Sequence, residues 1–236
     1  MATQKSGFEK WQDTINGSKT DKRWNDHDAT IAAAIKEFDT HLGETKGYAP
    51  LSWKLIKAMV WTESGGPDSP WWKSRAIQIG NPGDLGLDAL LGDKEGGDLI
   101  LPPAMKPKIT KASINTADIN IMAGIGYLLM RAASYEVVSV PDPRDTKTFE
   151  VPIKPRDSLA LIAEKNQSTV EMLKFLNPNL SPRKMKVGDP VSVRKASMQK
   201  VIKGWSKIDT RFAAENYNVG DPMYFTKLEF CLKLIG

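Results

Sequence analysis

The chain has 236 residues, which is enough for one large domain or two modest ones. Its content of 41% hydrophobic and 26% charged residues is that of a globular protein and excludes general disorder. The net charge of +5 favours an anionic partner such as cell wall, nucleic acid or a phospholipid surface, but lysines spread along the chain do not select nucleic acid.

Cysteine and histidine are rare in this chain. Cys231 is alone, which excludes an internal disulfide, and His27 and His41 form no Cys/His cluster typical of a metal site. We therefore expect no metal and no cofactor. Both histidines lie in a polar N-terminal region, and we expect them at the surface.

Membrane and export signals are also missing from the pattern. No stretch approaches the roughly 18 consecutive apolar residues of a membrane span, and the N-terminal segment lacks the apolar core of a secretory signal. We expect no membrane insertion. We expect synthesis in the cytoplasm and, if the substrate lies outside it, export without an ordinary signal peptide.

The first predicted elements are a loose arm and two helices. Residues 1–26 are polar and weakly patterned, which indicates the arm. A helix is predicted from Ala29 to Leu42, with Gly43 ending it. A second is predicted from Leu51 to Glu63, opened by Pro50 in its first turn.

The second helix ends its apolar stripe with a carboxylate. Ile56, Met59, Val60 and Glu63 fall at i, i+3, i+4 and i+7, on one face, and a Gly-Gly-Pro breaker follows shortly after. One interpretation is a helix-end glutamate that turns to solvent. The other is a catalytic acid in an apolar wall, whose pKa is raised by desolvation.

Residues 64–107 are rich in Gly, Pro and Asp, which predicts a long ordered surface with short helical turns where a cleft could form. A helix then starts near Asp118. Gly124 and Gly126 inside it each cost about 1 kcal/mol relative to alanine, so they indicate close approach of another helix or a ligand. A last amphipathic helix carries Tyr224, Leu228, Cys231, Leu232 and Ile235.

Residues 147–196 have a different character. Phe149, Val151 and Ile153 alternate as a short strand, and Val191 and Val193 indicate a second one. Between them, Asp157 and Ser158 can cap one helix, and Ser168 with Glu171 forms a capping box for another. The order strand, helix, helix, strand predicts a compact unit, preceded by the spacer VPDPRD at 140–145.

This unit resembles a LysM module, which binds peptidoglycan and chitin. The resemblance rests on Phe149-Glu150-Val151, Lys154 to Leu159, Ile162-Ala163, Ser168-Thr169-Val170, Leu173, Leu176-Asn177 and Val187-Gly188-Asp189; it departs at Arg156 and Gln167, where the family usually has glycine, and at Asp189-Pro190. It implies that N-acetylglucosamine contacts Asp157, Ser158, Leu159, Asn177 and Pro178.

The flanking sequence resembles the lytic transglycosylase and goose-type lysozyme superfamily. The matching motifs are Glu63-Ser64, Ala76-Ile77-Gln78-Ile79, Asn120-Ile121 with Ala123-Gly124 and Tyr127-Leu128, and Glu215-Asn216-Tyr217-Asn218 with Gly220-Asp221-Pro222 and Tyr224. Departures are Arg75 or Ala76 for the motif glycine, Ile77 for methionine and Val219 for alanine. The last motif follows the LysM-like unit, so we expect that unit to interrupt the catalytic domain.

We therefore expect an α+β protein. A mainly helical lysozyme-like domain, residues 1–146 plus 197–236, would be interrupted by a βααβ LysM module, residues 147–196. The resemblance implies cleavage of the peptidoglycan bond between N-acetylmuramic acid and N-acetylglucosamine, with Glu63 as acid and then base. It also implies that Ser64, Gln78, Tyr217 and Asn218 contact the sugar and that Asn120 is a structural support.

Several alternatives stay open at this level. Gly80-Asn81 stands where the goose-type branch can place an aspartate, which favours a transglycosylase giving 1,6-anhydro ends, but Asp68 and Asp84 keep a hydrolytic muramidase open. A non-catalytic wall-binding scaffold is another alternative. Trp61 is expected in the core, whereas Trp71 and Trp72 could stack on sugars or pack inside.

The expected partner is the glycan strand of peptidoglycan, and we expect no nucleic acid. Delivery would follow one of three routes: injection by a type VI secretion machine, phage-style release through the inner membrane, or display on a phage-like tail. We favour injection by the type VI machine. The chain would then be an antibacterial effector, and its further partners would be an immunity protein and a secretion-machine component. The product type, the delivery route and the oligomeric state are not determined by the sequence.

Overall fold

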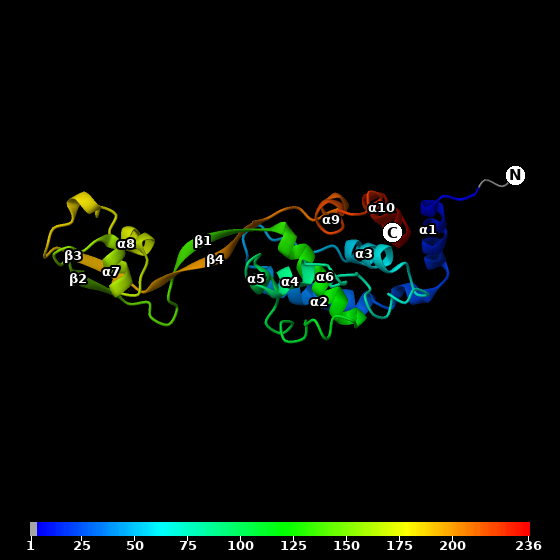
Figure 1. The fold of residues 1–236 in the computed structure, drawn as a ribbon, viewed down its shortest axis with the longest axis horizontal. Helices are drawn as coiled ribbons and strands as arrows, with labels where there is room; N and C mark the ends of the chain where they lie inside the picture. Colours follow the sequence, from blue (N-terminus) through cyan, green and yellow to red (C-terminus); the bar gives the residue numbers. More distant parts are fainter. Residues whose placement is uncertain (1–3) are drawn as a thin grey trace. The chain divides into compact units, whose positions relative to one another are not determined.

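The structure is a computed structural model that describes residues 4–236, and in it the chain forms two compact units (Figure 1). Unit 1 consists of the described residues up to Ser134 together with Ile202–Gly236, and unit 2 consists of Tyr135–Val201. Unit 1 is helical, whereas unit 2 combines short helices with antiparallel strands. The chain is therefore α+β.

Unit 1 is built around the apolar helix α6 (Ala117–Ala132). Its other helices are α1 (Gly7–Asn16), α2 (Asp28–Leu42), α3 (Trp53–Ser64), α4 (Gly86–Leu91), α5 (Gly97–Ile100), α9 (Thr210–Asn216) and α10 (Tyr224–Ile235), with 3-10 turns η1 (Gly17–Lys19) and η2 (Lys22–Asn25). Helix α6 contacts α2, α4, α5 and α9, while α3 packs against α2 and α10 (Figure 1). The α3–α10 pairing brings together segments from opposite sides of unit 2 in the sequence.

The two glycines of α6 lie where neighbours come close, as their cost predicted. A Cβ on Gly124 would lie 2.3 Å from Cγ2 of Ile77, and one on Gly126 would lie 3.2 Å from Cδ2 of Leu101. Real Cβ atoms do not tolerate the first distance, so only glycine at position 124 lets the chain carrying Ile77 lie against α6.

Helix α3 begins and ends at residues that explain its length. Its N-cap is Ser52, whose hydroxyl accepts from Leu55 N, so the predicted start at Pro50 and Leu51 was too early. The helix ends at Gly65, which has a left-handed φ of 74° and donates its N–H to the Trp61 carbonyl. The apolar stripe therefore runs up to Glu63 and stops within one residue of it.

The predicted loose arm is wrong for the part that the structure describes; its first three residues lie outside that part. Ser6 and Glu9 form a capping box that starts α1. On that helix, Ile15 is fully buried and Trp11 stacks on Phe8 and packs on Phe230 of α10. The Ser6 and Glu9 pair is a helix-start signal within the sequence, and the prediction missed it because the segment around it is polar.

Unit 2 contains the predicted strand, helix, helix, strand order. It has β2 (Thr148–Pro152), α7 (Leu159–Lys165), α8 (Val170–Leu176), η3 (Pro182–Lys184) and β3 (Pro190–Arg194). Strands β2 and β3 are antiparallel, with Phe149 opposite Val193 and Val151 opposite Val191. Ile153, Leu159, Ile162, Ala163, Leu173, Val191 and Val193 form a core of their own.

The capping predictions in unit 2 were half right. Ser158 caps α7 through Leu161 N, as predicted. The capping box of Ser168 and Glu171 was wrong, because Thr169 accepts from Met172 N and is the N-cap of α8. The Ser168 hydroxyl donates to the Arg194 carbonyl 2.6 Å away, and so ties the loop between the helices to β3.

A two-stranded ribbon, which was not predicted, precedes β2 and follows β3 in the sequence. β1 (Ala133–Pro141) and β4 (Ala196–Trp205) pair with each other, and β1 begins where α6 ends. At its base, Ser134 Oγ donates to the Gly204 carbonyl at 3.2 Å and Ser206 N donates to the Ala132 carbonyl at 2.8 Å. Across residues 4–236, none of the helices combines the length and the apolar character needed to cross a bilayer.

Candidate active site

Glu63 lies in the last turn of α3 and lines a pocket of about 230 Å³ within unit 1. Its side chain is half-buried. The pocket is lined by residues of α3, the 77–84 loop, α6 and the α9–α10 connection: Glu63, Ile77, Gln78, Ile79, Asn81, Asp84, Tyr127, Tyr217 and Asn218. Three sequence-predicted site residues, Gln78, Tyr217 and Asn218, are thus brought to Glu63.

The environment of the Glu63 carboxyl favours its protonated form. Desolvation raises the pKa of Glu63 to about 7, and the nearby carboxylate of Asp221 also raises it. Tyr224, Asn218 and Lys227 act in the opposite direction, and the Asn218 amide donates to Glu63 Oε1 at 3.2 Å. A carboxyl with this pKa can give up a proton and take it back near neutral pH.

Tyr224 is a second buried group beside this carboxyl. Its side chain is fully buried at the start of α10 and its hydroxyl interacts electrostatically with Glu63. Within the described residues that hydroxyl has no partner in hydrogen-bond geometry. The hydroxyl nevertheless lies close enough to lower the pKa of Glu63, so Tyr224 is a donor that favours the carboxylate form of Glu63.

Gln78 holds the loop opposite Glu63 in a strained conformation. Its φ of 57° is left-handed, which is uncommon for a residue with a side chain. The side-chain amide donates to the backbone carbonyl of Glu63 and accepts from Asn81 Nδ2 at 3.4 Å. The strain is therefore offset by contacts that fix this loop to the end of α3.

Two further predicted residues support the same loop. Tyr217 donates its hydroxyl to the Ile77 carbonyl at 2.9 Å. Asn120 is fully buried on α6, accepts from Ile77 N at 3.0 Å and donates to the carbonyls of Ile79 and Ile114 at 2.9 and 3.2 Å. Asn120 thus has the geometry of a structural support, and it does not line the pocket.

Ser64 is the predicted substrate-binding residue that the structure does not bring to the pocket. Only 3% of it is exposed, and its hydroxyl donates to the Val60 carbonyl at 2.6 Å and accepts from Gly66 N at 3.2 Å. Its contacts stabilise the turn after Glu63. Gly66 in that turn has a φ of 98° and lies against Trp24, where a Cβ would be 2.3 Å from the ring.

The tryptophans near Glu63 divide into core and surface. Trp61 and Trp72 are both buried and pack edge-on against Trp24, with ring centroids 5.0 and 5.8 Å away. Stacking of Trp72 on sugar is therefore excluded. Trp71 is 45% exposed and could contact a ligand.

The prediction of a surface position for His27 was wrong. It is 8% exposed, and its Nε2 lies 2.9 Å from the Trp72 carbonyl. Desolvation lowers the pKa of His27, so the neutral ring donates that hydrogen bond. His41 is exposed, as predicted.

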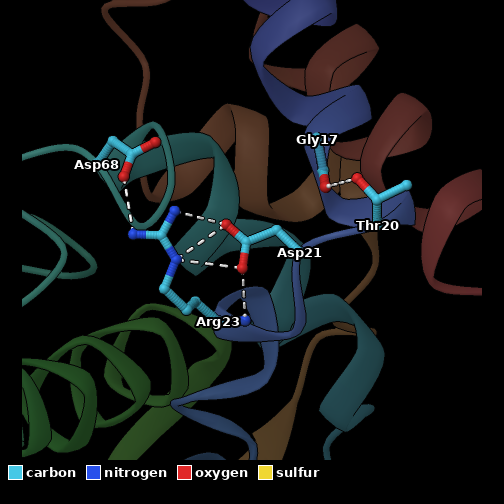
Figure 2. Close-up of polar contacts among 5 residues, drawn as sticks. All are labelled: Gly17, Thr20, Asp21, Arg23 and Asp68. Carbon is cyan, nitrogen blue, oxygen red and sulfur yellow. Dashed lines mark hydrogen bonds and ion pairs between the residues drawn. The ribbon is translucent and has the colours of Figure 1, made fainter.

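The two aspartates considered as second carboxylates lie in different places. Figure 2 shows Asp68 bound to the guanidinium of Arg23, at 2.8 Å, with Asp21 on its other side at 2.7 Å and the Gly17–Thr20 turn beside them. Asp68 does not line the pocket.

Asp84 does line the pocket. Its carboxylate oxygens accept from Gly80 N and Gly86 N, both at 2.8 Å, so it is already used to shape the loop.

In unit 2, two of the five predicted glycan-binding residues line a pocket, and the other three are buried or used in local contacts. Leu159 is buried in the core, Ser158 caps α7, and Asp157 accepts from Lys154 N at 2.8 Å and Lys165 Nζ at 2.9 Å. Asn177 bonds Ser192 through both side-chain atoms. Asn177 and Pro178 line a pocket of about 380 Å³ together with Asn179, Leu180, Lys184, Asp189 and Pro190.

Sequence reasoning did not assign Tyr127, Tyr224, Asp221 or Lys227 to the site. Tyr127 and Tyr217 pack edge-on at 5.7 Å in the pocket wall. The available signal was Tyr224 itself, since a tyrosine on an apolar stripe needs a place for its hydroxyl. Among residues 4–236, no three His, Cys, Asp or Glu side chains lie together so that they could hold one metal ion.

The chain is α+β, and in its helical unit the partly desolvated Glu63 carboxyl lines a polar pocket. Comparison with protein-family profiles, curated proteins and solved structures finds no match to this chain.

Proposed function

We propose that this chain cleaves the β-1,4 bond between N-acetylmuramic acid and N-acetylglucosamine in peptidoglycan, as a lytic transglycosylase with an inserted LysM module. The observation that carries the proposal is the Glu63 carboxyl, with a pKa of about 7, facing a pocket that also contains Gln78, Tyr217 and Asn218. A polar pocket beside a carboxyl that titrates near neutral pH suits general acid–base chemistry on a sugar.

In the proposed reaction, protonated Glu63 donates its proton to the glycosidic oxygen as the bond to the muramic C1 breaks. The substrate's own groups stabilise the positive charge that develops there. The muramic 6-hydroxyl then attacks C1, and the Glu63 carboxylate accepts its proton, so a 1,6-anhydro ring forms and Glu63 is regenerated. Asn218, which already donates to Glu63 Oε1, orients the carboxyl, while Gln78 and Tyr217 hold the loop against which the sugar lies.

Hydrolysis by a muramidase is the second candidate, and the position of Asp84 in the same pocket favours it. An inverting glycosidase needs a second carboxylate to activate water. Against this, both Asp84 oxygens accept backbone N–H groups, from Gly80 and Gly86, so the carboxylate already holds the loop in place. We therefore place transglycosylation first.

We propose that unit 2 supplies affinity for the same polymer. The pocket at Asn177 and Pro178 is the place where N-acetylglucosamine would lie, with Asp157 and Ser158 shaping the neighbouring loop. Binding by a separate unit raises the effective concentration of the glycan at Glu63.

The test is clearance of a purified peptidoglycan suspension by wild-type protein and by Glu63→Gln. The amide keeps the shape of the carboxyl but cannot donate the proton, so we expect the turbidity loss to fall at least about a hundredfold. Glu44→Gln, at an exposed position, is the matched control and should clear normally. If folded Glu63→Gln clears the wall like wild type, Glu63 is not the acid; if neither protein clears it, the chain is a binding scaffold.

A further inference from the structure

A second pocket of unit 1 lies at the other end of α3 from Glu63. Its volume is about 380 Å³, and its walls are the α2–α3 connection, including Tyr48 and Pro50, and the segment around Trp205 where β4 ends. Helix α3 has 12 residues, so its ends are about 18 Å apart. The pocket is therefore separate from the site at Glu63.

The two aromatic rings of this pocket are fixed by hydrogen bonds at their polar tips. The Tyr48 hydroxyl donates to Asp39 at 2.6 Å, and the Trp205 indole N–H donates to Thr45 Oγ1 at 2.9 Å. The rings meet edge to face, with centroids 5.0 Å apart and planes at 74°. Both residues are partly exposed. Because their rings are already held in place, a ligand can contact them with little entropic cost of ordering side chains.

The pocket carries little net charge. Lys207 is the one charged side chain among its lining residues, and its ammonium lies 3.5 Å from the Asp209 carboxylate. Ser206 adds an exposed hydroxyl at the rim. Flat apolar walls with hydroxyl and ammonium donors at the edge suit a neutral ligand that has one apolar face and many hydroxyls.

We propose that this pocket is a glycan-binding site, which takes one or two N-acetylated hexose rings against Tyr48 and Trp205. It binds polymer independently of cleavage at Glu63 and of the pocket in unit 2. Its volume lies within the range of about 300–1,000 Å³ that small-ligand pockets occupy. A proline-rich peptide also favours aromatic walls, but it needs a long groove to hold several turns of an extended helix, whereas two short chain segments close this pocket.

The test uses NMR of the full chain with Glu63→Gln, so that no glycan is cleaved during titration with N-acetylglucosamine trimer. Binding at this site shifts the Trp205 indole and Gly47 amide signals saturably, whatever occurs at other pockets. Tyr48→Leu removes a ring and weakens this binding about tenfold. Tyr48→Phe keeps the ring and retains binding, and so does Phe175→Leu, a control at an exposed aromatic residue outside the pocket.

The proposal is overturned if these two signals do not move in the folded protein, or if they move equally in Tyr48→Leu. It is also overturned if a proline-rich peptide shifts them and the trimer does not, which would make the pocket a peptide site. Wall clearance by the wild type does not enter this readout, so the binding site and the proposed cleavage can fail separately.

Discussion

The ionisation of Glu63 is set by burial at the end of an apolar stripe. Its carboxyl lies beside the fully buried Tyr224, and desolvation raises its pKa. Hydrogen bonding by Tyr224 and Asn218 and the charge of Lys227 limit the rise in the pKa of Glu63, which is about 7. A larger rise would leave less carboxylate to act as a base near neutral pH, and a smaller one would leave less acid.

This balance predicts the pH dependence of wall lysis. The raised pKa means that Glu63 is protonated below about pH 7 and loses its proton as pH rises through that value. Because the first step needs the acid form, lysis should fall about tenfold for each pH unit above 7. This pH dependence is measured by lysis rates between pH 5 and 9, together with NMR of the Glu63 carboxyl. Constant lysis up to pH 9 would show that Glu63 does not limit the reaction as an acid.

At the scale of elements, the site depends on how closely the 77–80 segment approaches α6. Asn120 accepts from Ile77 N and donates to the Ile79 carbonyl, and the Tyr217 hydroxyl donates to the Ile77 carbonyl. A Cβ on Gly124 would meet Ile77 at 2.3 Å and the Tyr217 hydroxyl at 2.8 Å. One glycine therefore sets the position of the pocket wall.

Gly124→Ala is expected to push Ile77 and Tyr217 away from α6 and reduce lysis at least tenfold, since small displacements at a site cost much activity. It should also lower the free energy of unfolding by about 1–3 kcal/mol through overpacking. The measurements are thermal or denaturant unfolding and wall clearance.

Gly126→Ala is the matched control on the same helix. Its Cβ would come nearest to Leu101, Leu90 and Phe38, at 3.2–3.3 Å, and none of these lines the pocket. We expect a change in stability and near-normal lysis per folded molecule. Equal loss of lysis in both variants would mean that Gly124 acts through general stability, not through the pocket.

At the scale of the whole molecule, the two units have separate cores. The core of unit 1 draws its buried residues from both ends of the chain, and that of unit 2 lies between Ile153 and Val193. Removing residues 147–196 and closing the gap with a short linker should therefore leave unit 1 folded, with weaker sedimentation on whole cell wall than the full chain. Circular dichroism and sedimentation measure both effects; complete unfolding of the shortened chain would contradict the inference.

The sequence predicted those elements whose signal is local. The apolar stripes of α3 and α6, and the alternation in β2 and β3, are set by residues close in the chain. Helix α1 has a local start signal in Ser6 and Glu9, but its contact between Trp11 and Phe230 is not local. The β1–β4 ribbon pairs segments more than fifty residues apart and has no local signal.

In the site, too, only features with a local signal could be predicted from the sequence. Glu63 could be singled out because its stripe and its motif coincide. The burial of His27 under Trp72 and the unpartnered Tyr224 hydroxyl beside Glu63 arise from tertiary packing. The resemblance implied that Ser64 contacts the sugar, but its hydroxyl donates back to the Val60 carbonyl one helical turn earlier.

The most direct test of the central claim is mass spectrometry of the soluble fragments released from purified peptidoglycan. Cleavage by Glu63 as acid and then base predicts muropeptides that end in 1,6-anhydro-N-acetylmuramic acid, one water lighter than reducing ends, and none from Glu63→Gln. Reducing ends alone would contradict transglycosylation and favour hydrolysis with Asp84. Release of no fragments by folded wild-type protein would contradict the proposed cleavage altogether.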